Sequence, residues 1–214
     1  MHVLHLSTAR ELELFDKSVI TEEKKITSEV CINHLWFNET DYKKYGAKIK
    51  VNPSIKTARD QEELFNALLN DHIDLIATDH APHLLEEKNN TYFKSPSGAP
   101  VIQHSLVAML EFYHQKKISL EKIVEKMCHA PSICFGIDKR GFIREGFYAD
   151  LVLVDLDSPW QVDRTNILHK CGWSSMDGQT FKSKVLNTFV NGNLVYNNTV
   201  FNESVKGMRL QFKR

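Results

Sequence analysis

The sequence predicts an α/β fold in which parallel strands alternate with helices, followed by a smaller layer of β-strands. Three apolar segments have the length of buried strands, namely residues 3–6, 26–32 and 74–78. Segments with helical spacing lie between them, at residues 9–15 and 58–69. Strands that recur at this spacing with intervening helices are typical of βαβ units.

The last third of the chain has a different pattern. Residues 149–155 form an apolar strand, and two further strand segments flank Asn191-Gly192, which is a strong signal for a type I′ hairpin. Short strands joined by tight turns predict a separate β layer. We therefore expect two units, residues 1–140 and 141–214.

Helices are expected between these two patterns. The helix at 58–69 begins with a capping box, in which Thr57 is the cap and Asp60 takes the place of the usual Glu or Gln. Further helices are expected at about 101–113, 119–127 and 130–135. The polar residues 84–94 are expected to form an exposed loop.

Composition excludes several classes of function. The chain has 214 residues with 27 Lys+Arg and 27 Asp+Glu, so its net charge of zero argues against a nucleic-acid partner. No apolar run approaches the roughly 18 residues of a membrane span. The first residues lack the pattern of a signal peptide, and the four cysteines include no C-x-x-C pair. We expect a cytoplasmic protein with reduced thiols and without a zinc site built from cysteine pairs.

The strongest candidate site is the segment that ends the strand at 74–78. Asp79, His80 and His83 follow this strand directly, and Pro82 forces the chain out of regular structure. In a parallel α/β barrel the carboxyl ends of the strands form the catalytic face. A carboxylate beside imidazoles can bind a metal or transfer protons. The alternative is an Asp that caps the next turn beside solvated histidines.

Three more positions are candidates, each with a structural alternative. His5 lies near the end of the strand at 3–6, where a buried core histidine is the simpler interpretation. Asn52 precedes Pro53 and would present its amide outward, although a plain Asn-Pro turn is also consistent. Gly98 lies in the tight turn 95–100 and would allow the backbone to approach a ligand closely, or would only form the turn.

Taken together and in order, these segments resemble dihydroorotase, of the cyclic-amidohydrolase branch of the amidohydrolase superfamily. The likeness extends to about residue 197. The segments that carry it are His5-Leu6-Ser7-Thr8, Glu29-Val30 with His34-Leu35, Val51-Asn52-Pro53-Ser54-Ile55-Lys56, Ala77-Thr78-Asp79-His80-Ala81-Pro82-His83, Pro96-Ser97-Gly98, and Gly141 to Leu153.

The resemblance implies a partial TIM-type (β/α)8 metal-dependent hydrolase barrel. Residues 1–140 would be the C-terminal portion of the barrel, with strands six to eight, and residues 141–214 the C-terminal part of a small composite β domain and a tail. The family's His-x-His after strand one, its strand-four bridging residue and its strand-five His have no counterpart here. The resemblance therefore implies a fragment or a truncated reading frame.

Roles carry over residue by residue. His5 matches the metal-ligating His of strand six, and Asp79 matches the strand-eight Asp that binds the metal and acts as general base. The expected substrate-binding residues are Asn52, His83, Pro96 and Gly98. The sequence departs from the family where Lys56 replaces an Arg and where Cys31-Ile32-Asn33-His34-Leu35 replaces Thr-Pro-His-His-Leu. These departures concern the shape of the pocket, since a lysine is a point charge and an arginine a planar fork.

The implied function is zinc-dependent interconversion of dihydroorotate and N-carbamoyl-aspartate in pyrimidine biosynthesis. The site would hold one or two zinc ions, the substrate would be a small molecule, and the enzyme would be a homo-oligomer such as a dimer. Two alternatives remain. One is a related ring-opening enzyme such as a hydantoinase, dihydropyrimidinase or allantoinase. The other is a non-catalytic dihydroorotase-like module, because His5 and Asp79 alone are too few ligands for tight zinc binding.

Overall fold

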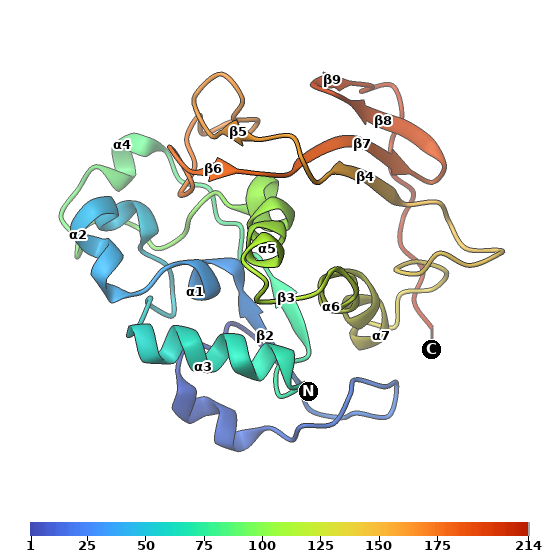
Figure 1. The fold of residues 1–214 in the computed structure, drawn as a ribbon, viewed down its shortest axis with the longest axis horizontal. Coiled ribbons are helices and arrows are strands. Elements are labelled where there is room, and N and C mark those ends of the chain that lie inside the picture. Colours follow the sequence, from blue (N-terminus) through green and yellow to red (C-terminus); the bar gives the residue numbers. More distant parts are fainter. Residues whose placement is uncertain (214) are drawn as a thin grey trace.

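Three parallel strands form the centre of the first part of the molecule (Figure 1). The computed structural model describes residues 1–213. The strands β1 (His2–Val3), β2 (Thr27–Cys31) and β3 (Leu75–Ala77) lie in the order β1-β2-β3 with both pairings parallel. The predicted α/β class is confirmed. Since the strands run the same way, their carboxyl ends share one edge of the sheet.

The first strand is shorter than predicted. It was expected over residues 3–6, but β1 ends at Val3 because His5 has a φ of +54°, which no strand residue adopts. The chain nevertheless stays beside β2, since the Leu6 amide donates to the Glu29 carbonyl at 2.9 Å. The bend changes the direction of the His5 side chain without detaching this segment from the sheet.

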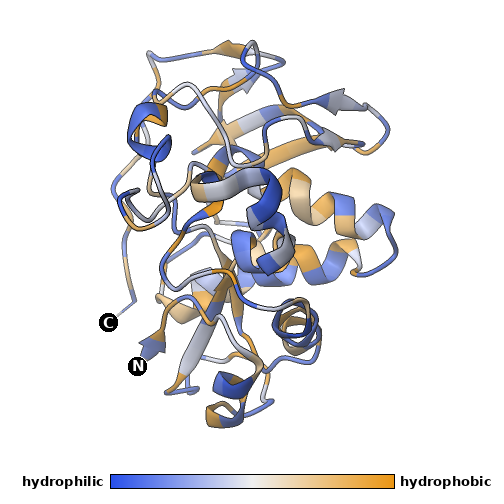
Figure 2. Cartoon of the chain, turned by 90° about the vertical axis from the view of Figure 1, so that its left-hand side faces the viewer, coloured by the Kyte–Doolittle hydropathy of each residue, from blue (hydrophilic) through white to orange (hydrophobic). Residues whose placement is uncertain are grey.

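The helix α3 (Ala58–Leu69) confirms the prediction at 58–69, including its capping box. The Asp60 amide donates to Thr57 Oγ1 at 3.1 Å, and the Thr57 amide donates to Asp60 Oδ2 at 3.3 Å. Leu64 and Leu68 are buried, so one face of the helix packs on the core. Helices that carry both hydrophilic and hydrophobic residues are visible in Figure 2.

The other helical segments are short. The segment predicted as a helix at 9–15 is a 3₁₀ helix, η1 (Ala9–Leu14), and a helix that was not predicted, α1 (Ile32–Trp36), follows β2 directly. The helix expected at 119–127 continues through a π-helical stretch into α7. The remaining helical segments are η2 (Glu39–Asp41), α2 (Tyr42–Tyr45), η3 (Gly46–Ile49), α4 (Leu85–Lys88), η4 (Ile102–His104), α5 (Ser105–His114), α6 (Leu120–Val124), η5 (Glu125–His129) and α7 (Ala130–Cys134).

The last part of the chain contains an antiparallel sheet in the order β4-β7-β8-β9. The hairpin predicted at Asn191-Gly192 is confirmed, with φ values of +52° and +82° at these two residues. Two short strands that were not predicted, β5 and β6, form a separate pair. The strands are β4 (Leu151–Asp155), β5 (Trp160–Gln161), β6 (Thr180–Phe181), β7 (Lys184–Val190), β8 (Asn193–Asn197) and β9 (Val200–Phe201).

The main core extends from α3 past the parallel strands and α5 to the β5–β6 pair (Figure 1). Val162, Met176 and Phe181 share this core with residues of the first part of the chain. The division into units 1–140 and 141–214 stays a prediction. No helix within residues 1–213 is long and apolar enough to cross a membrane.

Candidate metal and substrate site

The two predicted metal ligands lie close together at the carboxyl edge of the parallel sheet. His5 follows β1 by two residues, and Asp79 follows β3 by two residues. His5 Nε2 lies 3.8 Å from Asp79 Oδ1, and the two side chains are 22% and 33% exposed. An imidazole nitrogen and a carboxylate oxygen thus lie close together on partly exposed side chains, although the two residues are 74 positions apart in the sequence.

Both residues have a left-handed backbone. His5 has a φ of +54° and Asp79 a φ of +44°, a region that costs a residue with a side chain of the order of 1 kcal/mol or more. Asp and His both adopt this region more often than most residues with side chains, although it still carries a steric cost. The surrounding structure holds two strained residues close together. Such strain is typical of functional sites, where the position of the side chain matters more than the backbone cost.

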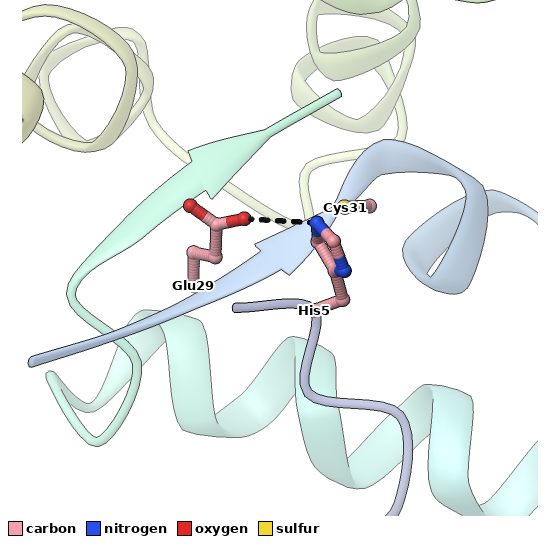
Figure 3. Close-up of side chains that lie close together, drawn as sticks. All are labelled: His5, Glu29 and Cys31. Atoms are coloured by element: carbon pink, nitrogen blue, oxygen red, sulfur yellow. Dashed lines mark ion pairs between the residues drawn. The ribbon is translucent and has the colours of Figure 1, made fainter. Parts of the chain in front are cut away.

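Two further donor groups lie beside His5, and they were not among the predicted ligands (Figure 3). Glu29 Oε1 lies 3.5 Å from His5 Nε2, and the ligand atoms of His5, Glu29 and Cys31 are all within 4.8 Å of one another. Glu29 and Cys31 are two positions apart on β2, and alternate residues of a strand share one face. This period of two was the signal in the sequence that could have identified them.

The environment keeps the neighbouring thiol and imidazole neutral. Burial, together with the negative charges of Glu29 and Asp79, raises the pKa of the Cys31 thiol far above its usual value. Burial lowers the pKa of His34, whose Nε2 donates to the carbonyl of Pro53 at 2.9 Å. His34 is therefore neutral and Cys31 carries its proton in the described structure.

The predicted substrate-binding residues surround the turn at Gly98. The Gly98 amide donates to the Lys50 carbonyl at 2.9 Å. This hydrogen bond holds the Gly98 turn against Lys50, which lies two residues before Asn52 in the chain. His83 Nε2 donates to the Ser97 carbonyl at 3.0 Å. Asn52 is exposed and is joined to the next residue by a cis peptide bond. The structure therefore brings Asn52, His83 and the Pro96–Gly98 turn to one place, while their roles stay predictions.

The segment 84–94 is not simply the exposed loop that was predicted. It contains α4, whose last residue, Lys88, is only 2% exposed. The Lys88 amine donates to three carbonyls, at 2.8 Å to Pro96, 2.8 Å to Gly98 and 3.2 Å to Lys50. Burial, and then the charge of Lys50, lower the pKa of Lys88 to about 8. A single buried amine thus ties together the segments that carry the predicted substrate contacts.

Replacing Lys88 by Met is expected to destabilise the protein by about 3 kcal/mol, because three buried carbonyls lose their donor. Urea unfolding measures the free energy, and limited proteolysis should show earlier cleavage within 84–98. The matched control is Lys94→Met, since Lys94 is exposed in the same segment. Equal stability of the two variants would show that the three hydrogen bonds of the Lys88 amine do not stabilise the protein.

A histidine cluster lies behind the strand end. His80 Nδ1 accepts hydrogen bonds from the backbone amides of Val101 and Ile102 at 3.1 and 3.3 Å, so its proton is on Nε2. The His80 ring centroid lies 5.0 Å from that of His169, which lies 5.8 Å from that of His104. Burial, and then the charge of His169, lower the pKa of His104 to about 4. His80 therefore anchors the loop after Asp79 through a neutral ring.

Acid is expected to destabilise the fold through His104. Its pKa is about 4 in the folded protein and 6.5 by the reference value, so the unfolded chain binds a proton first as the pH falls. The free energy of unfolding should fall between pH 6.5 and 4, by at most about 3 kcal/mol from this residue. Urea unfolding across this range should show a shallower pH dependence for His104→Gln. Identical slopes in the original protein and in His104→Gln would contradict the assignment.

The arrangement of parallel strands with a His and a carboxylate at their carboxyl edge is typical of metal-dependent α/β hydrolases. Residues 1–195 match the model of the Amidohydrolase family, and the chain belongs to this family.

Within this family, the chain is similar to curated proteins that are named dihydroorotase. The chain is 34% identical to a dihydroorotase of Anaplasma phagocytophilum over 195 residues. This alignment covers 91% of this chain and 43% of that protein. It is 33% identical over 194 residues to a dihydroorotase of Pyrococcus furiosus, covering 91% of this chain and 44% of that protein. The chain thus spans less than half the length of the curated relatives it matches.

Solved structures confirm the predicted fold class, a partial metal-dependent hydrolase barrel with additional β-strands. The chain superposes on an L-hydantoinase from Arthrobacter aurescens with a TM-score of 0.85 and 29% identity, over 94% of this chain and 46% of that one. A D-hydantoinase superposes with a TM-score of 0.82 at 24% identity, over 94% of this chain and 45% of that one, and shows the fold alone.

Proposed function

We propose that this chain contributes the metal-ligating and proton-transferring part of a dihydroorotase, which interconverts dihydroorotate and N-carbamoyl-aspartate. The observation that carries the proposal is the convergence of His5 and Asp79, 3.8 Å apart at the ends of β1 and β3. This convergence occurs in a chain that is 34% identical to a dihydroorotase over 91% of its length.

The donor set fits zinc, for which imidazole nitrogen and carboxylate oxygen are ordinary ligands. When bound, zinc supplies a water of lowered pKa and polarises the ring carbonyl. Asp79 accepts the proton of the attacking water at a carboxylate oxygen. It then returns that proton to the ring nitrogen, which leaves as the C–N bond breaks. The position of Asp79 at a strand end holds this carboxylate rigidly while a third of it stays exposed to substrate.

The surrounding residues favour a substrate that carries a carboxylate. His83 and Asn52 lie around the Pro96–Gly98 turn, whose backbone is held by Lys88. Lys56 adds a positive charge in this region, although its amine donates to the Ser54 carbonyl and hydroxyl at 2.9 and 2.8 Å. Recognition of the carboxylate would therefore depend more on His83 and Asn52 than on a forked Arg contact.

Two other functions have specific support. The superposition on an L-hydantoinase at 29% identity favours a hydantoin or dihydropyrimidine substrate as the second candidate. A non-catalytic module is the third, since the family's other ligands have no counterpart in these 214 residues. For the dihydroorotase we further propose a zinc metal centre, a place in pyrimidine biosynthesis, a cytoplasmic location and a homo-oligomeric state such as a dimer.

The test is a ring-opening assay with dihydroorotate, hydantoin and dihydrouracil. The purified chain would be assayed alone and after co-expression with the part of the Anaplasma phagocytophilum dihydroorotase that it does not match. We expect no turnover by the chain alone and turnover of dihydroorotate by the combination. Preference for hydantoin or dihydrouracil would favour the second candidate. A combination that assembles as a stable complex and opens none of the three rings would overturn catalysis in favour of the non-catalytic module.

A further inference from the structure

His5, Glu29 and Cys31 place metal-binding atoms close together at the carboxyl edge of the sheet, and the proposed function uses only His5 of these three. His5 Nε2 is 3.8 Å from Asp79 Oδ1 and 3.5 Å from Glu29 Oε1. The sulfur of Cys31 lies within 4.8 Å of the ligand atoms of both His5 and Glu29 (Figure 3). Glu29 and Cys31 lie on β2, and His5 and Asp79 follow the neighbouring strands β1 and β3, so their relative positions are a property of the sheet.

These separations suit a tetrahedral ion. With zinc bonds of about 2.0–2.3 Å, neighbouring ligand atoms of a tetrahedron lie roughly 3.3–3.8 Å apart. The His5–Glu29 separation already has this size. The Cys31 sulfur lies within 4.8 Å of both ligand atoms, so it would need to approach them by at most about 1.5 Å to reach this geometry.

We propose that Cys31 and Glu29 act as metal ligands together with His5, so that this chain binds one divalent transition-metal ion through a mixed N, O and S site beside Asp79. The proposal does not depend on ring-opening activity. It revises the expectation that two ligands are too few, because a donor set of three from the described residues can hold an ion without a further chain.

The chemistry of the three groups supports a soft or borderline ion. A thiolate ligand favours zinc, cobalt or cadmium over magnesium and calcium, which prefer oxygen. An ion that coordinates Cys31 displaces the thiol proton, which leaves to solvent as the metal–sulfur bond forms. The two carboxylates lower the cost of placing a dication at this point of the structure.

Exposure and the surrounding contacts also fit. Cys31 and Glu29 are 1% and 5% exposed and would form the base of the site, while the partly exposed His5 and Asp79 would form its entrance. Glu29 Oε2 is hydrogen-bonded to His2 Nε2 at 2.9 Å, which leaves Oε1 directed at His5. A second contact that orients a ligating carboxylate is common around metal sites.

The simpler interpretation treats Cys31 as a small core residue that binds nothing, because free cysteine is among the most buried residue types. Absorption spectroscopy separates the two, since only a sulfur bound to cobalt gives thiolate-to-metal charge-transfer absorption. We would titrate the purified, reduced 214-residue chain with Co²⁺ alone. The expected result is one Co²⁺ per chain, with charge-transfer absorption in the near ultraviolet and visible bands of tetrahedral intensity.

Variants identify the ligands. Cys31→Ser is expected to lose the charge-transfer absorption and to weaken Co²⁺ binding by at least about tenfold. Glu29→Gln is expected to weaken binding while keeping the sulfur band. The matched control is Cys134→Ser, because Cys134 Sγ lies 3.5 Å from His2 Nδ1 and borders the same region without belonging to the cluster. This control should titrate as the unmodified chain does.

Several outcomes would overturn the proposal. They are the absence of Co²⁺ binding, binding without charge-transfer absorption, or a sulfur band that survives in Cys31→Ser and disappears in Cys134→Ser. Circular dichroism of each variant establishes that it folds. If Cys31→Ser does not fold, Cys31→Ala is used in its place. Since no step measures turnover, a negative result here leaves the dihydroorotase assay independent.

Discussion

Replacing Asp79 by Asn is expected to reduce ring opening by at least about 10²-fold while leaving the fold intact. The substitution removes the carboxylate that accepts and returns the proton, and the amide that replaces it has no such capacity. Asn tolerates the left-handed backbone, so the φ of +44° can be kept. The measurement is kcat with dihydroorotate in the co-expressed assembly, together with the circular dichroism spectrum and Tm of the variant.

A control separates loss of proton transfer from general disturbance of this region. Asp71 also has a positive φ, of +63°, but lies away from the strand end and pairs with Lys122 and Lys126. Asp71→Asn should lower Tm and keep most of the activity. If Asp79→Asn retained more than a few per cent of the original kcat, Asp79 could not be the general base.

Replacing Gly98 by Ala is expected to destabilise the protein by about 3 kcal/mol or more and to displace the predicted substrate turn. Gly98 has a φ of +127°, which side chains rarely adopt, and an added Cβ would lie 2.6 Å from the Ala81 carbonyl oxygen and 3.1 Å from His83 Cδ2. The backbone of the Gly98 turn and that of the segment at Ala81 must therefore move apart to accommodate the methyl group. Urea unfolding gives the free energy of unfolding.

Gly146→Ala is the matched control because it isolates the conformational part of this cost. Gly146 has a φ of +80° with nothing within 4 Å of an added Cβ, so only backbone strain remains. We expect Gly146→Ala to cost about 1 kcal/mol. If the two variants were equally stable, the contact with the Ala81 carbonyl would be unimportant and the turn would be more adaptable than its geometry implies.

Sequence patterns predicted the elements whose cause is local. The capping box at Thr57 and Asp60, the apolar spacing of α3, and Asn191-Gly192 each determine structure within a few residues, and all three were confirmed. The end of the first strand was predicted wrongly, since the left-handed turn at His5 has no local sign in Val3 to Leu6. The helix α1 was missed because its five residues pack as part of the core and show little amphipathic pattern.

Some residues of the candidate site could be predicted from the sequence, and others could not. His5 and Asp79 could be named because parallel strands place their carboxyl ends at one edge, and the family resemblance then assigned the residues. Glu29 and Cys31 were missed because a buried carboxylate and thiol in a strand are understood only once the neighbouring strand end is placed. Lys88 was missed since its acceptors at Lys50, Pro96 and Gly98 become its neighbours only when the chain folds.

The left-handed backbone at His5 and Asp79 has a consequence for any effort to make this protein more heat-resistant. Glycine occupies that region without steric cost, so a library selected only for thermal tolerance would enrich glycine at positions 5 and 79. Each such gain would remove an imidazole or a carboxylate from the strand edge. A screen that rewards heat tolerance alone would therefore find its improvements at the residues it should leave untouched, and these two positions are best fixed before a library is built.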